Sequence, residues 1–204
     1  MTLRLAVLGD SIAAGHGAGQ PQDTIARRLV RRLRRQGLDA RSRVFALSGA
    51  RSSGLAQQVE LALTWQPHLA VIVVGANDVT NQTPPREAAR HLAEAVRRLR
   101  EVGAEVVVAP APDLSMVPHV PAFLRPAVRA ASARLRTAQV EAATAAGAAI
   151  ADGDGRTSEA FNSDRRLFSA DRFHPSSAGY AVITRELWPH VQAAAETATA
   201  RGAA

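Results

Sequence analysis

The sequence predicts an α/β fold, a three-layer α/β/α sandwich built on a mostly parallel five-stranded sheet. Strand-like and helix-like stretches alternate along the whole chain, which is the pattern of parallel strands joined by crossover helices. Residues 69–74 are apolar at every position, as expected for a strand covered on both faces. The chain of 204 residues has no internal repeat and no interdomain linker, so we expect residues 1–204 to form one domain.

Two strands and two helices are expected before this central strand. Residues 3–8 are a short apolar strand that ends at Gly9, and residues 22–36 repeat apolar side chains at helical spacing between arginines. Residues 43–47 form the second strand. Residues 53–63 form the second helix, with a serine at its start as the N-cap.

The alternation continues after the central strand. Helices are expected over residues 85–102 and 125–146, and each is followed by glycine, a usual signal for the end of a helix. Residues 105–109 and 148–151 form the fourth and fifth strands. Each of these helices therefore connects two successive strands of the predicted sheet.

Irregular structure is expected in three places. Residues 110–126 hold five of the eleven prolines together with apolar side chains. This segment either walls a pocket or closes over it as a lid, or it is a stiff connector that packs on the core. A polar loop follows the fifth strand, before a last helix over residues 176–195. The tail after Thr197 is expected to fray.

Composition excludes several kinds of chemistry. The chain has no cysteine, so it forms no disulfide, no zinc–thiolate site and no cysteine nucleophile. It has 25 basic and 18 acidic residues, for a net charge of +7, and every basic residue is an arginine. The first helix carries a basic face that we expect to be solvated, with docking to phospholipid or nucleic acid as the alternative. Its arginines are Arg27, Arg28, Arg31, Arg32, Arg34 and Arg35.

The location and the partners follow from similar observations. No apolar run is long enough to span a bilayer. Residues 1–9 are too short for a secretion signal and lead directly into the first polar motif. We therefore expect a cytoplasmic protein without stable membrane insertion or a nucleic-acid partner, and a monomer or a weak homo-oligomer.

Four short polar motifs interrupt the apolar pattern. They are Gly9-Asp10-Ser11, Ser48-Gly49, Gly75-Ala76-Asn77-Asp78 and Asp171-Arg172-Phe173-His174. The first three begin where a predicted strand ends, and the fourth lies in the loop after the fifth strand. Because parallel sheets bind ligands beyond the carboxyl ends of their strands, we expect all four motifs to gather at one edge.

Ser11, His174 and Asp171 are residue types that serve as nucleophile, base and orienting carboxylate. A serine hydroxyl attacks a carbonyl only when a base takes its proton, and imidazole is the usual base. A carboxylate on the other ring nitrogen selects the tautomer and stabilises the imidazolium. The alternatives are that Ser11 is a helix cap or a turn serine, and that Asp171 and His174 are a surface pair capping the last helix.

Gly49 and Asn77 suit an oxyanion hole. Glycine lets a backbone N–H approach closely, and an asparagine amide adds a fixed donor. The backbone N–H of Ser11 would be the third donor. Taken alone, Gly49 is equally compatible with a turn, and Asn77 with a turn or a cap.

The four motifs in this order resemble those of the SGNH, or GDSL-type, hydrolase superfamily, named for Ser, Gly, Asn and His in four blocks. The resemblance extends from residue 3 to about residue 190, with Ile12 in place of the usual leucine of the first block. It implies a flavodoxin-like α/β/α fold and an esterase or lipase that needs no cofactor. It assigns Ser11 as nucleophile, His174 as base, Asp171 as its partner, and Ser11, Gly49 and Asn77 as oxyanion donors.

By the same resemblance, Asp10 and Asp78 brace the loops through hydrogen bonds. A competing hypothesis is a metal site formed by Asp10, Asp78, Asp171 and His174, because carboxylates at strand ends bind Mg²⁺ or Mn²⁺ in phosphoesterases. That site would leave the serine, the glycine and the asparagine without a function. We therefore expect no metal.

The expected reaction is hydrolysis of carboxylic esters with small or medium acyl chains, through an acyl-enzyme on Ser11. The apolar segment 110–126 favours an acyl ester over a sugar. Carbohydrate O-deacetylase, lysophospholipase and thioesterase activities are alternatives that the resemblance leaves open. A metal-dependent phosphoesterase and a non-catalytic binding module are alternatives of other classes.

Overall fold

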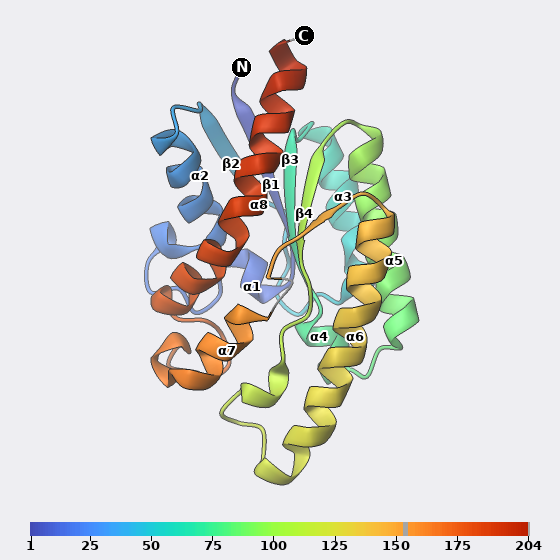
Figure 1. The fold of residues 1–204 in the computed structure, drawn as a ribbon, viewed down its shortest axis with the longest axis vertical. Coiled ribbons are helices and arrows are strands. Elements are labelled where there is room, and N and C mark those ends of the chain that lie inside the picture. The colour runs from blue at the N-terminus through green and yellow to red at the C-terminus, as the bar shows by residue number, and fades with distance from the viewer. Residues whose placement is uncertain (153–154, 204) are drawn as a thin grey trace.

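The computed structural model describes residues 1–152 and 155–203. Within these ranges, five strands form one parallel sheet in the order β2-β1-β3-β4-β5 (Figure 1). The strands are β1 (Leu3–Gly9), β2 (Ala40–Val44), β3 (Leu69–Val73), β4 (Glu105–Ala109) and β5 (Ala149–Ile150). The predicted parallel α/β architecture is confirmed.

Helices cover both faces of this sheet (Figure 1). On one face lie α2 (Ile25–Arg35) and α8 (Ser177–Ala203), and on the other lie α3 (Leu55–Thr64), α5 (Pro85–Glu101) and α6 (Arg125–Ala145). Side chains of β3 alternate between the layers: Leu69 and Val71 join the apolar cluster under α2 and α8, and Ala70 and Ile72 join the cluster on the other side. The central strand is therefore buried on both faces.

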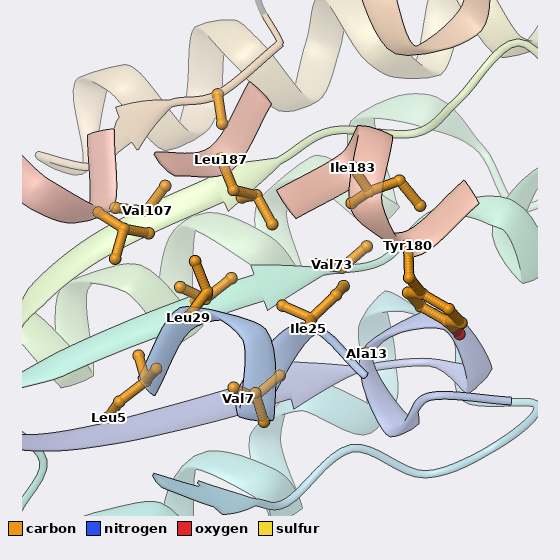
Figure 2. Close-up of a cluster of buried hydrophobic side chains, with 14 of the residues drawn as sticks. Leu5, Val7, Ala13, Ile25, Leu29, Val73, Val107, Tyr180, Ile183 and Leu187 are labelled. Atoms are coloured by element: carbon orange, nitrogen blue, oxygen red, sulfur yellow. The ribbon is translucent and has the colours of Figure 1, made fainter. Parts of the chain in front are cut away.

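Figure 2 shows the layer formed by α2 and α8. Leu29 from α2 and Leu187 from α8 point toward the strands, where Val7 of β1 and Val107 of β4 face them. Tyr180, near the start of α8, points toward α1. All five side chains are almost completely buried, so this layer anchors the start of α8 to the sheet.

Three short helices lie at the carboxyl edge of the sheet (Figure 1): α1 (Ser11–Ala14), α4 (Ala76–Thr80) and α7 (Arg156–Ser163). Single 3₁₀ turns occupy Pro21–Asp23, Ser52–Gly54, Leu114–Met116, Ala122–Leu124 and Arg165–Leu167. Because α1 follows β1 and α4 follows β3 directly, both helices begin at the edge where the strands end. This edge holds the first and third polar motifs.

Gly9 allows two neighbouring strands to meet at this edge. Its φ is +130°, and a Cβ at this position would lie 1.8 Å from the carbonyl oxygen of Val73. Any side chain would therefore push β1 away from β3 at the point where the chain turns toward Ser11.

The second strand begins three residues earlier than the range 43–47 that the sequence predicts. It is an edge strand whose charged side chains face solvent, so its start lacks an apolar signal. Pairing nevertheless continues beyond its assigned end, because the N–H groups of Phe45 and Leu47 donate to carbonyls of β1 at 2.8 and 3.1 Å.

The polar loop expected after the fifth strand contains α7 and a 3₁₀ turn, whereas residues 153 and 154 of that loop lie outside the described residues. The helix is short and polar, and its one fully buried side chain is Phe161, which is 4% exposed. A single aromatic anchor gives no periodic pattern, so sequence reasoning missed this helix.

The last helix continues to Ala203, so the prediction that it ends near residue 195 is wrong; residue 204 is not described. The expected fraying after Thr197 stays a prediction. Ala198 is buried in the apolar cluster, and Arg201 pairs with Glu105 of β4. These tertiary contacts hold the final turns in place. None of the helices within the described residues combines the length and the apolar character that a membrane span requires.

Candidate active site

Ser11 lies at the carboxyl edge of the sheet as the first residue of α1. Asp10 caps this helix, because its side chain accepts the N–H of Ile12 at 3.0 Å. Gln58 of α3 holds Gly9 through two hydrogen bonds of 2.7 and 2.9 Å. Ser11 itself is only 7% exposed. The turn that presents its hydroxyl is therefore fixed to the core.

His174 and Asp171 form a hydrogen-bonded line with Ser11. Nε2 of His174 lies 3.0 Å from Oγ of Ser11, and Nδ1 lies 2.6 Å from Oδ2 of Asp171. An ionised carboxylate only accepts hydrogen bonds, so the ring proton belongs on Nδ1 and Nε2 is left to accept the hydroxyl proton. The arrangement can thus move a proton from the serine to the ring.

A local turn holds the carboxylate of Asp171. Its Oδ1 accepts hydrogen bonds from Oγ of Ser169 at 2.7 Å and from the backbone N–H groups of Phe173 and His174 at 2.9 Å each. Burial acts to raise the pKa of Asp171, but the hydrogen bonds from the His174 ring, Ser169 and the backbone lower it well below its usual range. Asp171 therefore remains ionised at neutral pH. Within the same turn, Arg172 adopts φ +57°, a left-handed conformation that is strained for a side-chain-bearing residue.

Gly49 lies in a turn, and Asn77 lies in the first turn of α4, which contacts it. Nδ2 of Asn77 donates to the carbonyl of Ala50, the residue after Gly49, at 3.0 Å. The N–H of Leu47 donates to the carbonyl of Gly9 at 3.1 Å, which places the second motif beside the first. A primary amide has two N–H groups, so Asn77 retains one for a ligand. The structure thus brings the first three motifs together.

Asp10 and Asp78, the two carboxylates expected to brace the loops, are both buried. Asp78 is 0% exposed and accepts hydrogen bonds from the N–H and the hydroxyl of Ser52 at 2.9 and 2.8 Å. Burial, joined by the negative charge of Asp78, raises the pKa of Asp10 to about 7, although the N–H of Ile12 acts to lower it. Both carboxylates tie backbone segments together, Asp10 through the N–H of Ile12 and Asp78 through the N–H of Ser52.

Sequence reasoning missed three side chains that hold the site: Gln58, Ser169 and Tyr180. The hydroxyl of Tyr180 donates to the carbonyls of Ile12 and His16 at 3.2 and 2.7 Å and so fixes the chain after the nucleophile. A signal existed for Gln58, which is a polar side chain on the apolar face of its predicted helix and therefore needs a buried partner. Tyr180 and Ser169 gave no comparable signal.

A mostly apolar cavity of about 50 Å³ is lined by side chains next to the candidate site residues in the sequence. Ile12, Ala76 and Phe173, the sequence neighbours of the serine, the asparagine and the histidine, line one part of it. The segment 110–126 contributes Pro112, Leu114, Met116 and Val117. Phe161 and Phe168 also line the cavity, with their ring centroids 5.0 Å apart in an edge-to-face pair. The proline-rich segment therefore walls this small cavity.

The four-residue metal site considered as an alternative is not assembled. Among the described residues, the one group of three candidate ligands with donor atoms within 4.8 Å of one another is His16, Asp171 and His174. Asp10 and Asp78 do not belong to it. The ring of His16 lies against that of His174, with centroids 4.2 Å apart.

Comparisons with known proteins identify the family of the chain. A model of the GDSL-like lipase/acylhydrolase family matches residues 7–182. The chain is 36% identical over 184 residues to a GDSL-like esterase of Mycobacterium tuberculosis; the match covers 88% of this chain but only 59% of that relative, less than two thirds of its length. It is 29% identical over 191 residues to the esterase TesA of Pseudomonas aeruginosa, covering 91% of this chain and 86% of that protein.

Solved structures show the same fold. A crystal structure of TesA matches with a TM-score of 0.77 and 26% identity, covering 94% of this chain and 99% of the other. A catalytic mutant of an acetylxylan esterase from Geobacillus stearothermophilus matches with a TM-score of 0.73 and 18% identity, covering 93% and 94%. At that identity the second match supports the fold alone.

Proposed function

The chain belongs to the GDSL-like lipase/acylhydrolase family, and on that premise we propose that it is a serine esterase that cleaves carboxylic esters of short acyl chains. The observation that carries the proposal is the continuous line from Ser11 Oγ to His174 at 3.0 Å and from His174 to Asp171 at 2.6 Å. This line supplies a nucleophile, a base and an orienting carboxylate.

In the first half of the reaction, Oγ of Ser11 attacks the ester carbonyl while its proton passes to Nε2 of His174. The ionised carboxylate of Asp171 stabilises the imidazolium that forms. Negative charge develops on the carbonyl oxygen, and the N–H groups of Ser11 and Gly49 and the second N–H of Asn77 are the proposed donors. The C–O bond of the ester then breaks, and His174 gives its proton to the leaving alcohol.

In the second half, water replaces the alcohol. His174 takes a proton from the water as its oxygen attacks the acyl carbon. Collapse of the second tetrahedral intermediate breaks the bond to Oγ, and Ser11 recovers its proton from His174. The carboxylic acid leaves, and no step needs a cofactor.

The cavity supports a short acyl chain. A water molecule needs about 10–15 Å³ of such space, so this cavity of 50 Å³, lined by the sequence neighbours of Ser11, Asn77 and His174, accommodates only a few non-hydrogen atoms. Its lining is apolar, which suits a hydrocarbon chain better than a sugar. We therefore refine the expectation of small or medium chains toward the small end, with Met116 and the Phe161–Phe168 pair limiting the length.

A series of p-nitrophenyl esters from acetate to decanoate tests this proposal. We expect the highest kcat/KM for acetate to butyrate, and for Ser11→Ala a loss of at least about 10³-fold with an unchanged unfolding midpoint. A fluorophosphonate probe should label the wild type and leave Ser11→Ala unlabelled. Turnover that survives Ser11→Ala would reject the nucleophile.

A second pair of variants tests the acyl pocket. Met116→Ala enlarges the cavity from the loop side and should move the preference toward longer chains. Leu61→Ala, an exposed position on α3, is the matched control and should leave the preference unchanged. A preference for decanoate in the wild type would reject the short-chain assignment but not the serine mechanism.

A further inference from the structure

His16 has no role in the proposed reaction, although it lies next to the base. Its ring and that of His174 have centroids 4.2 Å apart, tilted by 47°. Donor atoms of His16, Asp171 and His174 all lie within 4.8 Å of one another. The side chains of His16 and Asp171 are exposed, so solvent reaches the space between them.

We propose that His16, Asp171 and His174 bind Zn²⁺, and that the bound ion inhibits hydrolysis. Two imidazoles and a carboxylate are a donor set that suits zinc, and they leave the fourth tetrahedral position to water. Metal–ligand bonds of about 2.0–2.2 Å place tetrahedral ligands roughly 3.4 Å apart. Donor atoms up to 4.8 Å apart would therefore close by as much as about 1.4 Å, whereas Nδ1 of His174 and Oδ2 of Asp171, now 2.6 Å apart, would separate slightly if both bind the ion.

His16 is the residue that can make this movement. Its backbone carbonyl is held by the hydroxyl of Tyr180 at 2.7 Å, whereas its exposed ring can turn about the side-chain bonds. Asp171 already faces His174 at 2.6 Å. An open groove lined by His16, Gly17, Ala18 and Asp171 exposes two of the three residues to solvent.

Binding at either nitrogen of His174 would stop proton transfer. At Nε2 the ion would take the lone pair that accepts the Ser11 proton, now 3.0 Å away. At Nδ1 it would displace the ring proton to Nε2, which then carries an N–H and has no lone pair to accept the Ser11 proton. The binding is independent of the proposed esterase function, but the inhibition rests on it.

Calorimetric titration of Ser11→Ala protein with ZnCl₂ measures binding without any need for activity. Ser11→Ala/His16→Ala should bind Zn²⁺ at least about tenfold more weakly. Ser11→Ala/His91→Ala is the matched control, because His91 lies on α5 across the sheet, and it should bind as the parent does. Loss of the d–d absorption of bound Co²⁺ in the His16 variant should accompany the loss of affinity.

Ester hydrolysis under Zn²⁺ then tests inhibition. We expect His16→Ala to raise the half-inhibitory concentration by the same factor as it raises the dissociation constant. Equal zinc affinity with and without His16, or a parent that binds no Zn²⁺, would overturn the site while leaving the esterase proposal intact. Full turnover by zinc-saturated wild type would overturn the inhibition. Zinc binding by a protein without Ser11-dependent ester hydrolysis would instead refute the proposed function.

Discussion

The two sides of the candidate site are held in different ways. The nucleophile side, formed by Ser11 and the turns around it, is buried, and its hydrogen bonds join distant segments, such as Gln58 with Gly9 across 49 positions. The base side, residues 169–174, is more open: the side chain of Asp171 is 41% exposed, and its partners lie within three positions of it. One side therefore depends on the core, and the other is a local turn. Substitutions on the two sides should separate catalytic rate from stability.

The largest effect is expected on the base side. Asp171→Asn removes the charge that stabilises the imidazolium and favours the wrong ring tautomer, and the equivalent change in serine proteases lowers kcat about 10⁴-fold. We expect a loss of about 10³–10⁴-fold in kcat with p-nitrophenyl acetate, with little change in the urea midpoint at pH 7. Asp164→Asn is the control for an exposed carboxylate nearby. A normal kcat in Asp171→Asn would contradict the proposed triad.

A smaller loss of rate is expected for the oxyanion donor on the nucleophile side. Asn77→Ala should lower kcat by about 10²–10³-fold, with a smaller change in KM, because the amide acts on charge that develops in the transition state. Steady-state kinetics measure both constants, and the exposed Asn162→Ala is the control. An effect confined to KM would indicate that Asn77 binds the ground-state substrate instead.

Loss of the Gln58 hydrogen bonds to Gly9 should lower stability more than it lowers the catalytic rate. Gln58→Ala removes the side-chain partner of the buried N–H of Gly9, at about 1–3 kcal/mol, and leaves the carbonyl of Gly9 with the N–H of Leu47 as its partner. We expect the free energy of unfolding in urea to fall by about 1–3 kcal/mol, accompanied by a modest loss of kcat. The neighbouring Gln57 is exposed, so Gln57→Ala should change neither. Equal stability of the two variants would show that Gln58 does not stabilise the backbone at Gly9.

The last expected effect is a pH dependence of stability that arises from Asp10. Its folded pKa of about 7 lies above the ordinary value of 3.8, so the folded state binds its proton more tightly than the unfolded state does. Its contribution to stability is therefore complete below pH 4 and is lost as pH rises toward 7, at no more than about 1.4 kcal/mol per pH unit. Asp10→Asn should abolish this slope between pH 4 and 7 in urea unfolding.

The difference in the free energy of unfolding between the wild type and Asp10→Asn at each pH isolates the contribution of Asp10 from those of other groups. Burial also raises the pKa of Asp152, which adds to the same slope in both proteins. The lowered pKa of Asp171 acts in the opposite sense, because its contribution is present above its ordinary pKa and is lost only as pH falls below that value. Identical slopes in the wild type and Asp10→Asn would show that Asp10 is ionised throughout this range.

Most elements of the fold were predictable from the sequence. The prediction for β4 matches its observed bounds, and that for β3 is one residue too long, because each strand is an apolar run with clear breaks on both sides. The edge strand β2 and the helix α7 carry few buried side chains, so their sequences contain little periodic signal. The extension of α8 to Ala203 depends on contacts with β4 and the apolar cluster, which no local pattern records.

The sequence by itself determined the chemical groups of the candidate site and the edge at which they gather, because parallel strands deliver their carboxyl ends to one side of a sheet. Only the tertiary structure decided how those groups are oriented. Three contacts show this: His174 lies 3.0 Å from Ser11, Gln58 bonds to Gly9, and the ring of His16 lies beside that of His174. Each of them joins segments that are distant in the sequence. Such distances depend on how helices pack against the sheet, and packing is a property of the whole chain rather than of any motif.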